Sequence, residues 1–257
     1  MYQKIAITYD VKNKKITTEA QKLIKQYNLL EADSSSSFDA IVILGGDGFA
    51  LHSFHKFIDL NIPFYGVNYG TVGFLMNSAK TTNLLQQIEN SVIIESSTLK
   101  AIVSTTEATY TRYAINEISF LRHTSQAAKI KISINGIERI AQMIGDGICI
   151  STPIGSAAYN FSLAGPILPL DSELLSIMPI SPFRPKYWRG ALIADNSTIE
   201  IESLERQKRP LNFSNDFNTI EHITYAKIAL DKKKKIRLLF NQETSLSERM
   251  IREQFLM

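Results

Sequence analysis

Residues 39–48 of the chain read DAIVILGGDG, an apolar run that ends in two glycines, an aspartate and a third glycine. Five consecutive apolar residues predict a strand that is buried on both faces, as in a parallel α/β sheet. Apolar residues then recur at helical spacing over residues 50–58, which predicts an amphipathic helix. Asp47 therefore occupies a tight turn between a buried strand and a helix start, where open α/β sheets bind ligands.

Two interpretations of Asp47 follow from this turn. The three glycines allow the backbone to approach a phosphate closely and leave the carboxylate free to point at a ligand. Alternatively, Asp47 only caps the helix, as aspartates often do. A four-residue motif does not decide between them, so both interpretations stay open at this point.

Composition and charge limit the class of protein. The 257 residues are 44% hydrophobic and 21% charged, as in ordinary globular proteins. The formal net charge of +3 is too small to imply nucleic acid and suits an anionic small-molecule substrate. The single cysteine, Cys149, excludes an intrachain disulfide and fits a reducing compartment. There is no signal-peptide pattern and no apolar run of about 18 residues, so we expect a soluble cytoplasmic protein without a membrane partner.

The first part of the chain alternates strands and helices. Strands are expected at residues 4–9, 40–44 and 62–67, and helices at residues 17–27, after Asp47 and around residues 84–88. Residues 68–74, NYGTVGF, form a second glycine loop after the third strand. Right-handed crossovers in such a series place both glycine loops on one edge of the sheet.

From about residue 99 the helical periods give way to short β-rich runs. Asn135 and Gly136 separate two of these runs and indicate a tight hairpin turn. Residues 179–189 are rich in proline, basic and aromatic residues and suggest a loop, and residues 157–164 a short helix. Ser245 and Glu248 form a capping-box pattern that predicts a last helix to about residue 255.

Known phosphate-binding motifs do not explain the chain, because it has no P-loop and neither Gly-Asp-Gly extends into Gly-x-Gly-x-x-Gly. Five short pieces taken together resemble the NAD kinase family in order and approximate spacing. The resemblance covers nearly the whole chain and is closest to bacterial members, within a wider group that includes diacylglycerol kinases and phosphofructokinases. The pieces are residues 45–48, 70–74, 116–117, 145–147 and 152–159.

The resemblance implies a fold and an activity. It implies an α/β N-terminal domain with a parallel sheet (residues 1–98) and a β-rich, β-sandwich-like domain for dinucleotide binding and oligomerisation (residues 99–232). Residues 233–257 would return to the N-terminal domain and pack a helix on it. The implied enzyme uses ATP, with Mg²⁺ or another divalent cation, to phosphorylate NAD. A cytoplasmic homo-oligomer, dimer or tetramer, is also implied, with sites partly shared between subunits.

Roles follow residue by residue from the same resemblance. Asp47 would accept the proton of the adenosine-ribose 2′-hydroxyl as this group attacks the γ-phosphate of ATP. The amides of Gly46 and Gly48 would cradle the pyrophosphate, and Phe74 would line the adenosine side. Asn116 and Glu117 would bind ribose or adenine, and Asp146 the ribose on the nicotinamide side. Ala158, Tyr159 and Ser162 would contact the bases, with Ala157 beside them; no metal ligand is assigned.

Simpler interpretations remain for several of these residues. Asn116 and Glu117 could be polar strand ends, and Asp146 a turn residue. His52 and His55 lack a third metal ligand, which favours packing, and Cys149 suits an inert core position. Residues 232–235, all lysine, suggest a solvated turn. Arg184, Lys186 and Arg189 could decorate a loop or contact a phosphate across a subunit interface.

Two departures from the family pattern and two rival functions complete the expectations. Phe49 and Ala157 stand where many relatives carry a hydroxyl residue, so each removes a possible hydrogen bond to the ligand. The rivals are a lipid kinase of the diacylglycerol type and a non-catalytic dinucleotide sensor. The polar pair Asn116 and Glu117 speaks against acyl chains, and the intact Asp47 speaks against a sensor.

Overall fold

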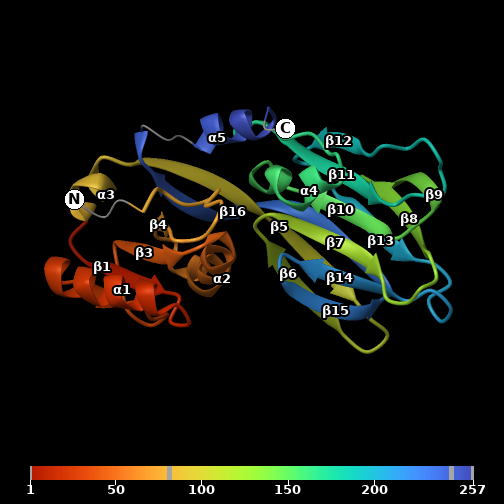
Figure 1. Ribbon diagram of the computed structural model, residues 1–257. Helices are drawn as coiled ribbons and strands as arrows, with labels where there is room; N and C mark the ends of the chain where they lie inside the picture. Colours follow the sequence, from red (N-terminus) through yellow and green to blue (C-terminus); the bar gives the residue numbers. More distant parts are fainter. Residues whose placement is uncertain (1, 80–82, 243–245, 256–257) are drawn as a thin grey trace. The chain divides into compact units, whose positions relative to one another are not determined.

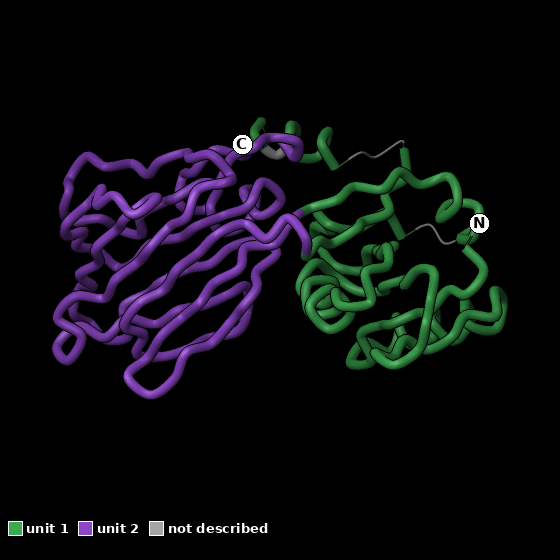
Figure 2. Tube along the Cα trace, turned by 180° about the vertical axis from the view of Figure 1, so that it is seen from behind, with its two compact units in different colours: residues 1–96, 234–257 green, residues 97–233 purple. Residues whose placement is uncertain are grey.

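The computed structural model describes residues 2–79, 83–242 and 246–255. Within these limits the chain forms two compact units, coloured separately in Figure 2. Unit 1 comprises Met1–Ser96 and Lys234–Met257, and unit 2 comprises Ser97–Lys233. Among the described residues, no helix has both the length and the apolar character that crossing a membrane requires.

Unit 1 is built on a parallel sheet (Figure 1). Its strands run in the order β2-β1-β3-β4, and the end of β16 pairs with β4 through Leu238 and Phe64. The βαβ series expected from the sequence is therefore confirmed. The strands are β1 (Ile5–Tyr9), β2 (Leu30–Glu31), β3 (Ala40–Gly45), β4 (Phe64–Asn68) and β16 (Tyr225–Phe240), and the helical segments are α1 (Lys14–Tyr27), α2 (Asp47–Phe57), η1 (Ile58–Leu60), α3 (Leu84–Glu89) and α5 (Leu246–Glu253).

Strand β3 is buried along its whole length because helices cover both faces of the sheet. Val42 and Leu44 belong to one apolar cluster with Leu23 of α1, whereas Ile41 points to the opposite face and is equally buried. On that second face, helix α2 packs Phe54 against Phe64 of β4, with ring centroids 5.1 Å apart. The reading of residues 40–44 as a strand buried on two sides is confirmed.

Unit 2 is a β-sandwich. One antiparallel sheet has the order β12-β11-β10-β7-β14-β15; the other contains β9, β8, β13 and the first part of β16, with β5 and β6 beside them. Side chains of both sheets share one core, in which Phe120 and Phe213 stack edge to face at 5.5 Å. The elements are β5 (Val92–Ser104), β6 (Thr109–Ala114), β7 (Glu117–Arg122), β8 (Ala128–Ile134), β9 (Ile137–Gly145), β10 (Gly147–Ser151), η2 (Ile154–Ala157), α4 (Tyr159–Ser162), β11 (Leu174–Ile180), β12 (Ala191–Ala194), β13 (Ile199–Ser203), β14 (Leu211–Asn215) and β15 (Asn218–Ile223).

The structure corrects three local expectations. Pro179 lies in strand β11 and not in a loop; it falls beyond the residues that pair with β12, where a strand tolerates a missing N–H. The expected strand over residues 220–230 is broken at Thr224, where the chain passes from one sheet to the other. The lysines of residues 232–235 lie within β16, and Lys232 pairs with Asp195 at 2.8 Å.

Candidate active site

The first glycine turn of unit 1 presents free amides at a helix start. Strand β3 ends at Gly45, Gly46 is the N-cap residue of α2, and Asp47 is the first residue of this helix. The first intrahelical bond runs from the N–H of Ala50 to the carbonyl of Gly46, so the N–H groups of Asp47 and Gly48 have no helix partner. A Cβ built on Gly48 meets no atom within 4 Å. The turn therefore offers amide donors and open space to an anion.

The second glycine loop lies directly against the first. A Cβ on Gly70 would come within 2.9 Å of the Cα of Gly46, and the N–H of Tyr69 donates to the carbonyl of Gly45 at 2.7 Å. Asn68 shapes this loop by accepting a hydrogen bond from the N–H of Gly70 at 2.8 Å. The expectation that both glycine loops share one sheet edge is confirmed.

The carboxylate of Asp47 joins the two loops. Its two oxygens accept hydrogen bonds from the backbone N–H groups of Phe74 and Leu75, each at 2.8 Å. The side chain makes no capping bond to α2, so the helix-cap interpretation is wrong. Each carboxylate oxygen has a second lone pair. Half-buried Asp47 can thus accept a further hydrogen bond without releasing the loop.

Arg249 of α5 supports the same loop and was not identified from the sequence. Its guanidinium donates to the carbonyls of Gly73 and Met76, and it stacks on Phe240 at 5.5 Å. The pKa of Arg249 is lowered, because the effect of burial exceeds the opposite effect of the negative charge of Asp47. The guanidinium of Arg249 and the carboxylate of Asp47 therefore both hold the loop of residues 73–76. The expected N-cap of α5, Ser245, lies outside the described residues.

In unit 2, Asn116 directly precedes β7 and Glu117 begins it, and each has a side-chain oxygen that the described residues leave without a partner. Asn116 Oδ1 and Glu117 Oε2 are buried and make no hydrogen bond within the described part of the chain. Their backbone is fixed by Asp216, whose carboxylate accepts the N–H groups of Ile115, Asn116 and Glu117 at 2.7, 2.9 and 3.2 Å. Buried polar atoms without partners are uncommon in folded proteins, so this pair is suited to a polar ligand.

Burial gives Glu117 an unusual proton affinity. The pKa of Glu117 is raised from 4.5 to about 8, mainly by burial of the carboxyl group and secondly by the nearby charge of Asp216. A hydrogen bond from the backbone N–H of Tyr159 acts in the opposite direction and lowers it. Burial also raises the pKa of Tyr159, and the charges of Cys149, Glu117 and Asp146 add to that shift. The expected residues of unit 2 therefore lie near one another, around the start of α4.

Asp146 lies between β9 and β10 in the second Gly-Asp-Gly. Its Oδ1 accepts a hydrogen bond from Arg122 Nε at 2.5 Å, an ion pair in which both side chains are partly exposed. Gly147 cannot carry a side chain, because a Cβ there would lie 1.9 Å from the carbonyl oxygen of Phe120. Asp146 therefore lies in the turn between two strands and is oriented by an arginine, which is compatible with both interpretations of this residue.

The segment after β10 is held by its hydroxyl groups. Thr152 Oγ1 donates to the carbonyl of Ile115 at 2.8 Å and accepts the N–H of Gly155 at 3.1 Å. A Cβ on Gly155 would lie 2.0 Å from the carbonyl oxygen of Asn116. In place of one short helix, η2 and α4 meet at Ala158, whose φ of −96° and ψ of −122° interrupt helical geometry. Ala157, Ala158 and Tyr159 are half-buried, and Ser162 is exposed.

Phe49 has a structural role at the first turn. A Cβ on Gly45 would come within 2.7 Å of the Phe49 ring, so the ring covers the end of β3.

His52 and His55 both lie on α2, as expected. Cys149 is buried in β10, and burial raises the pKa of its thiol, in keeping with an inert core position.

An α/β unit with a Gly-Gly-Asp-Gly turn, together with a β-sandwich whose buried polar atoms lack partners among the described residues, fits a nucleotide-binding protein that has no P-loop. Comparison with known proteins makes this specific. Residues 2–93 match the ATP-NAD kinase N-terminal domain, and residues 115–221 match the ATP-NAD kinase C-terminal domain. The chain belongs to the NAD kinase family.

Individual relatives agree with this assignment. NAD kinase of Rickettsia felis is 46% identical over 253 residues, and that of Rickettsia canadensis is 45% identical over 255; both alignments cover 98% of each chain. The crystal structure of yeast NADH kinase complexed with NADH has a TM-score of 0.81 at 19% identity, covering 98% of this chain and 87% of that one. An NAD kinase from Archaeoglobus fulgidus in complex with ATP has a TM-score of 0.77 at 20% identity, covering 98% of both chains. The expected fold class is confirmed.

Proposed function

We propose that the protein transfers the terminal phosphoryl group of ATP to the 2′-hydroxyl of the adenosine ribose of NAD, giving NADP and ADP, with Asp47 as the base. The observation that carries the proposal is the geometry of Asp47. Its carboxylate is fixed by two loop amides, retains lone pairs for a hydroxyl group, and lies beside free amides at a helix N-terminus.

The reaction needs few protein groups. The 2′-oxygen attacks the γ-phosphorus, the bond from this phosphorus to the β,γ-bridging oxygen breaks, and the hydroxyl proton passes to Asp47. Phosphoryl transfer depends mainly on in-line positioning and neutralised charge, so one placed carboxylate and several amides suffice in kind. A positioned base typically contributes about 10²- to 10⁴-fold in rate.

The nucleotide-binding roles are proposed for the residues with unused polar atoms. The amides of Gly46 and Gly48 bind the pyrophosphate, and Phe74 lines the adenosine. Asn116 Oδ1 and Glu117 Oε2 pair with ribose or base atoms, which supplies the partners that the described part of the chain does not offer them. Asp146 binds the nicotinamide ribose through Oδ2, which makes no hydrogen bond among the described residues. Ala157, Ala158, Tyr159 and Ser162 contact the bases.

Mg²⁺ fits this arrangement as a partner of ATP. The first glycine turn offers a single carboxylate, that of Asp47, and Mg²⁺ is usually held by one or two carboxylates together with substrate phosphates and water. Bound Mg²⁺ would neutralise charge on the transferring phosphate. Asp47 is assigned as the base and not as a metal ligand, so phosphate oxygens of ATP and water would hold the ion.

We further propose a cytoplasmic homo-oligomer, a dimer or tetramer, assembled through unit 2. Large apolar side chains are exposed there: Phe183 and Tyr187 are 62% and 80% accessible in the loop after β11, and Ile137 of β9 is 55% accessible. The backbone N–H of Phe183 donates to the carbonyl of Ile144, which fixes this loop to β9. A second copy of the chain would remove these side chains from water.

The decisive assay incubates the purified protein with ATP, Mg²⁺ and NAD and measures NADP with an NADP-specific dehydrogenase. NADP should form in proportion to enzyme. Saturable NAD binding by calorimetry without NADP would leave a dinucleotide sensor, and transfer of ³²P to diacylglycerol alone would leave a lipid kinase. Either result would overturn the proposal.

A further inference from the structure

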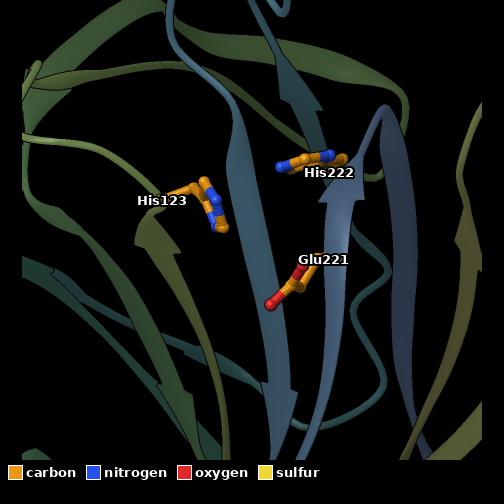
Figure 3. A group of neighbouring side chains, drawn as sticks. All are labelled: His123, Glu221 and His222. Carbon is orange, nitrogen blue, oxygen red and sulfur yellow. The ribbon is translucent and has the colours of Figure 1, made fainter.

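A group of three potential metal ligands lies on the surface of unit 2, on residues that have no assigned role in nucleotide binding. Among the described residues, the ligand atoms of His123, Glu221 and His222 all lie within 4.8 Å of one another, and all three residues are exposed. His123 directly follows β7, and the other two belong to β15. Figure 3 shows the three side chains around one shared space.

An irregularity in the strand pairing creates this grouping. Leu211 of β14 pairs with Ile223 and Phe213 pairs with Ile220, so Glu221 and His222 face the single residue between them on β14. Neighbouring residues of a regular strand point to opposite faces, but a β-bulge redirects one of them. His222 has a φ of +55°, an uncommon conformation for a residue other than glycine. The bulge therefore brings Glu221 and His222 to the same ligand position.

Asn212, the residue opposite the bulge, holds both histidines. Its side-chain oxygen accepts the backbone N–H of His222 at 3.3 Å, and its amide nitrogen lies 3.1 Å from His123 Nδ1. The two imidazole rings meet edge to face, with centroids 4.5 Å apart. The amide nitrogen is a donor, so His123 Nδ1 accepts this bond, and a metal ion bound at Nδ1 would take the place of the amide.

We propose that His123, Glu221 and His222 bind a divalent transition-metal ion of the Zn²⁺ type. Two imidazoles and one carboxylate are a common ligand set for Zn²⁺, whereas Mg²⁺ prefers oxygen ligands alone. Ligand atoms about 2.0–2.1 Å from a tetrahedral ion lie about 3.3 Å apart, so these exposed side chains close by about 1.5 Å or less onto the ion. Three protein ligands leave the fourth position for water or for a group from another molecule.

The test uses protein without a polyhistidine tag and without nucleotide, so that added metal has no competing ligands. Co²⁺ is titrated first, because its visible absorption reports imidazole coordination, and Zn²⁺ is then used to displace it. One equivalent of Co²⁺ should bind per chain. His123→Ala and His222→Asn should each weaken binding by at least about 100-fold, more than the loss of an outer-shell partner typically costs; asparagine tolerates positive φ and preserves the bulge.

His52→Gln is the matched control, since it removes an imidazole from α2 in unit 1 and should leave Co²⁺ affinity unchanged. Circular dichroism of each variant establishes that it is folded. Absence of Co²⁺ and Zn²⁺ binding to the wild-type chain would overturn the proposal. So would binding that persists in folded His222→Asn protein, or that is lost in His52→Gln.

Discussion

Replacing Glu117 by glutamine should change how the stability of unit 2 depends on pH. The folded protein keeps the proton of Glu117 up to about pH 8, whereas the unfolded chain releases it near 4.5. Between these values the unfolded state binds fewer protons, so the free energy of unfolding falls as pH rises, by about 1.36 kcal/mol per pH unit. Over the whole interval the loss is about 5 kcal/mol, and it is complete above pH 8.

Glutamine has nearly the same shape and does not titrate, so Glu117→Gln removes this loss. The ligand-free variant should gain several kcal/mol relative to wild type between pH 5 and pH 9. Urea unfolding is followed by the fluorescence of Trp188, the one tryptophan of the chain, which packs against the core of unit 2. The signal therefore reports the unit that contains Glu117.

Glu138→Gln serves as the matched control, because Glu138 is an exposed acid of β9 that pairs with Lys131 at 3.8 Å. Surface substitutions of this kind usually change stability by about 0.5 kcal/mol or less. If the stability difference between wild type and Glu117→Gln is the same at pH 5 and pH 9, burial does not hold the proton on Glu117, and the reasoning is refuted.

Three further substitutions test the glycines and Arg249. Gly48→Ala should leave the free energy of unfolding unchanged or raise it by up to about 1 kcal/mol, because the position is helical and open. NADP formation should nevertheless fall, because the methyl group occupies the space of the phosphate, and full activity would argue against the phosphate role. Gly155→Ala should lower the free energy of unfolding, measured in urea, by at least about 2 kcal/mol, because the added Cβ meets the Asn116 carbonyl. A loss under about 0.5 kcal/mol would contradict this packing. Arg249→Ala should lower the free energy of unfolding in urea by about 1–3 kcal/mol, because it leaves the carbonyl of Gly73 without its donor. An unchanged unfolding midpoint would show that Arg249 does not stabilise the loop.

Local patterns predicted the parts of the fold that depend on neighbours in sequence. The apolar run before Gly45 and the glycine turn after it are decided within ten residues. Asn135 and Gly136 both adopt positive φ, 55° and 75°, so the hairpin turn forms as its sequence indicates. Where residues close together in the chain determine the structure, the sequence was sufficient.

Contacts between distant residues were beyond such patterns. Asp216 binds the backbone of Asn116 across 100 residues of chain, and Arg249 reaches Gly73 across 176. Nothing in the spacing of either residue indicates its partner. Asp47 shows the same limit: its motif predicted a carboxylate in a turn, but its bonds to the amides of Phe74 and Leu75 depend on how the two loops pack.

The role of Asp47 is tested most directly by the turnover of Asp47→Asn at saturating ATP, Mg²⁺ and NAD. Both carboxylate oxygens of Asp47 accept backbone N–H groups. In Asp47→Asn the side-chain NH2 group faces one of these N–H groups, donor against donor, and this also loosens the loop. Arg249→Ala loosens the same loop and leaves the carboxylate in place, so it is the reference variant. NAD affinity, measured by calorimetry, should stay within about tenfold of wild type in both.

We predict that Asp47→Asn lowers kcat by about 10²- to 10⁴-fold below that of Arg249→Ala, the contribution expected of a positioned base. A turnover within tenfold of the Arg249→Ala value would show that Asp47 only holds the loop, and the assignment of Asp47 as the base would be wrong.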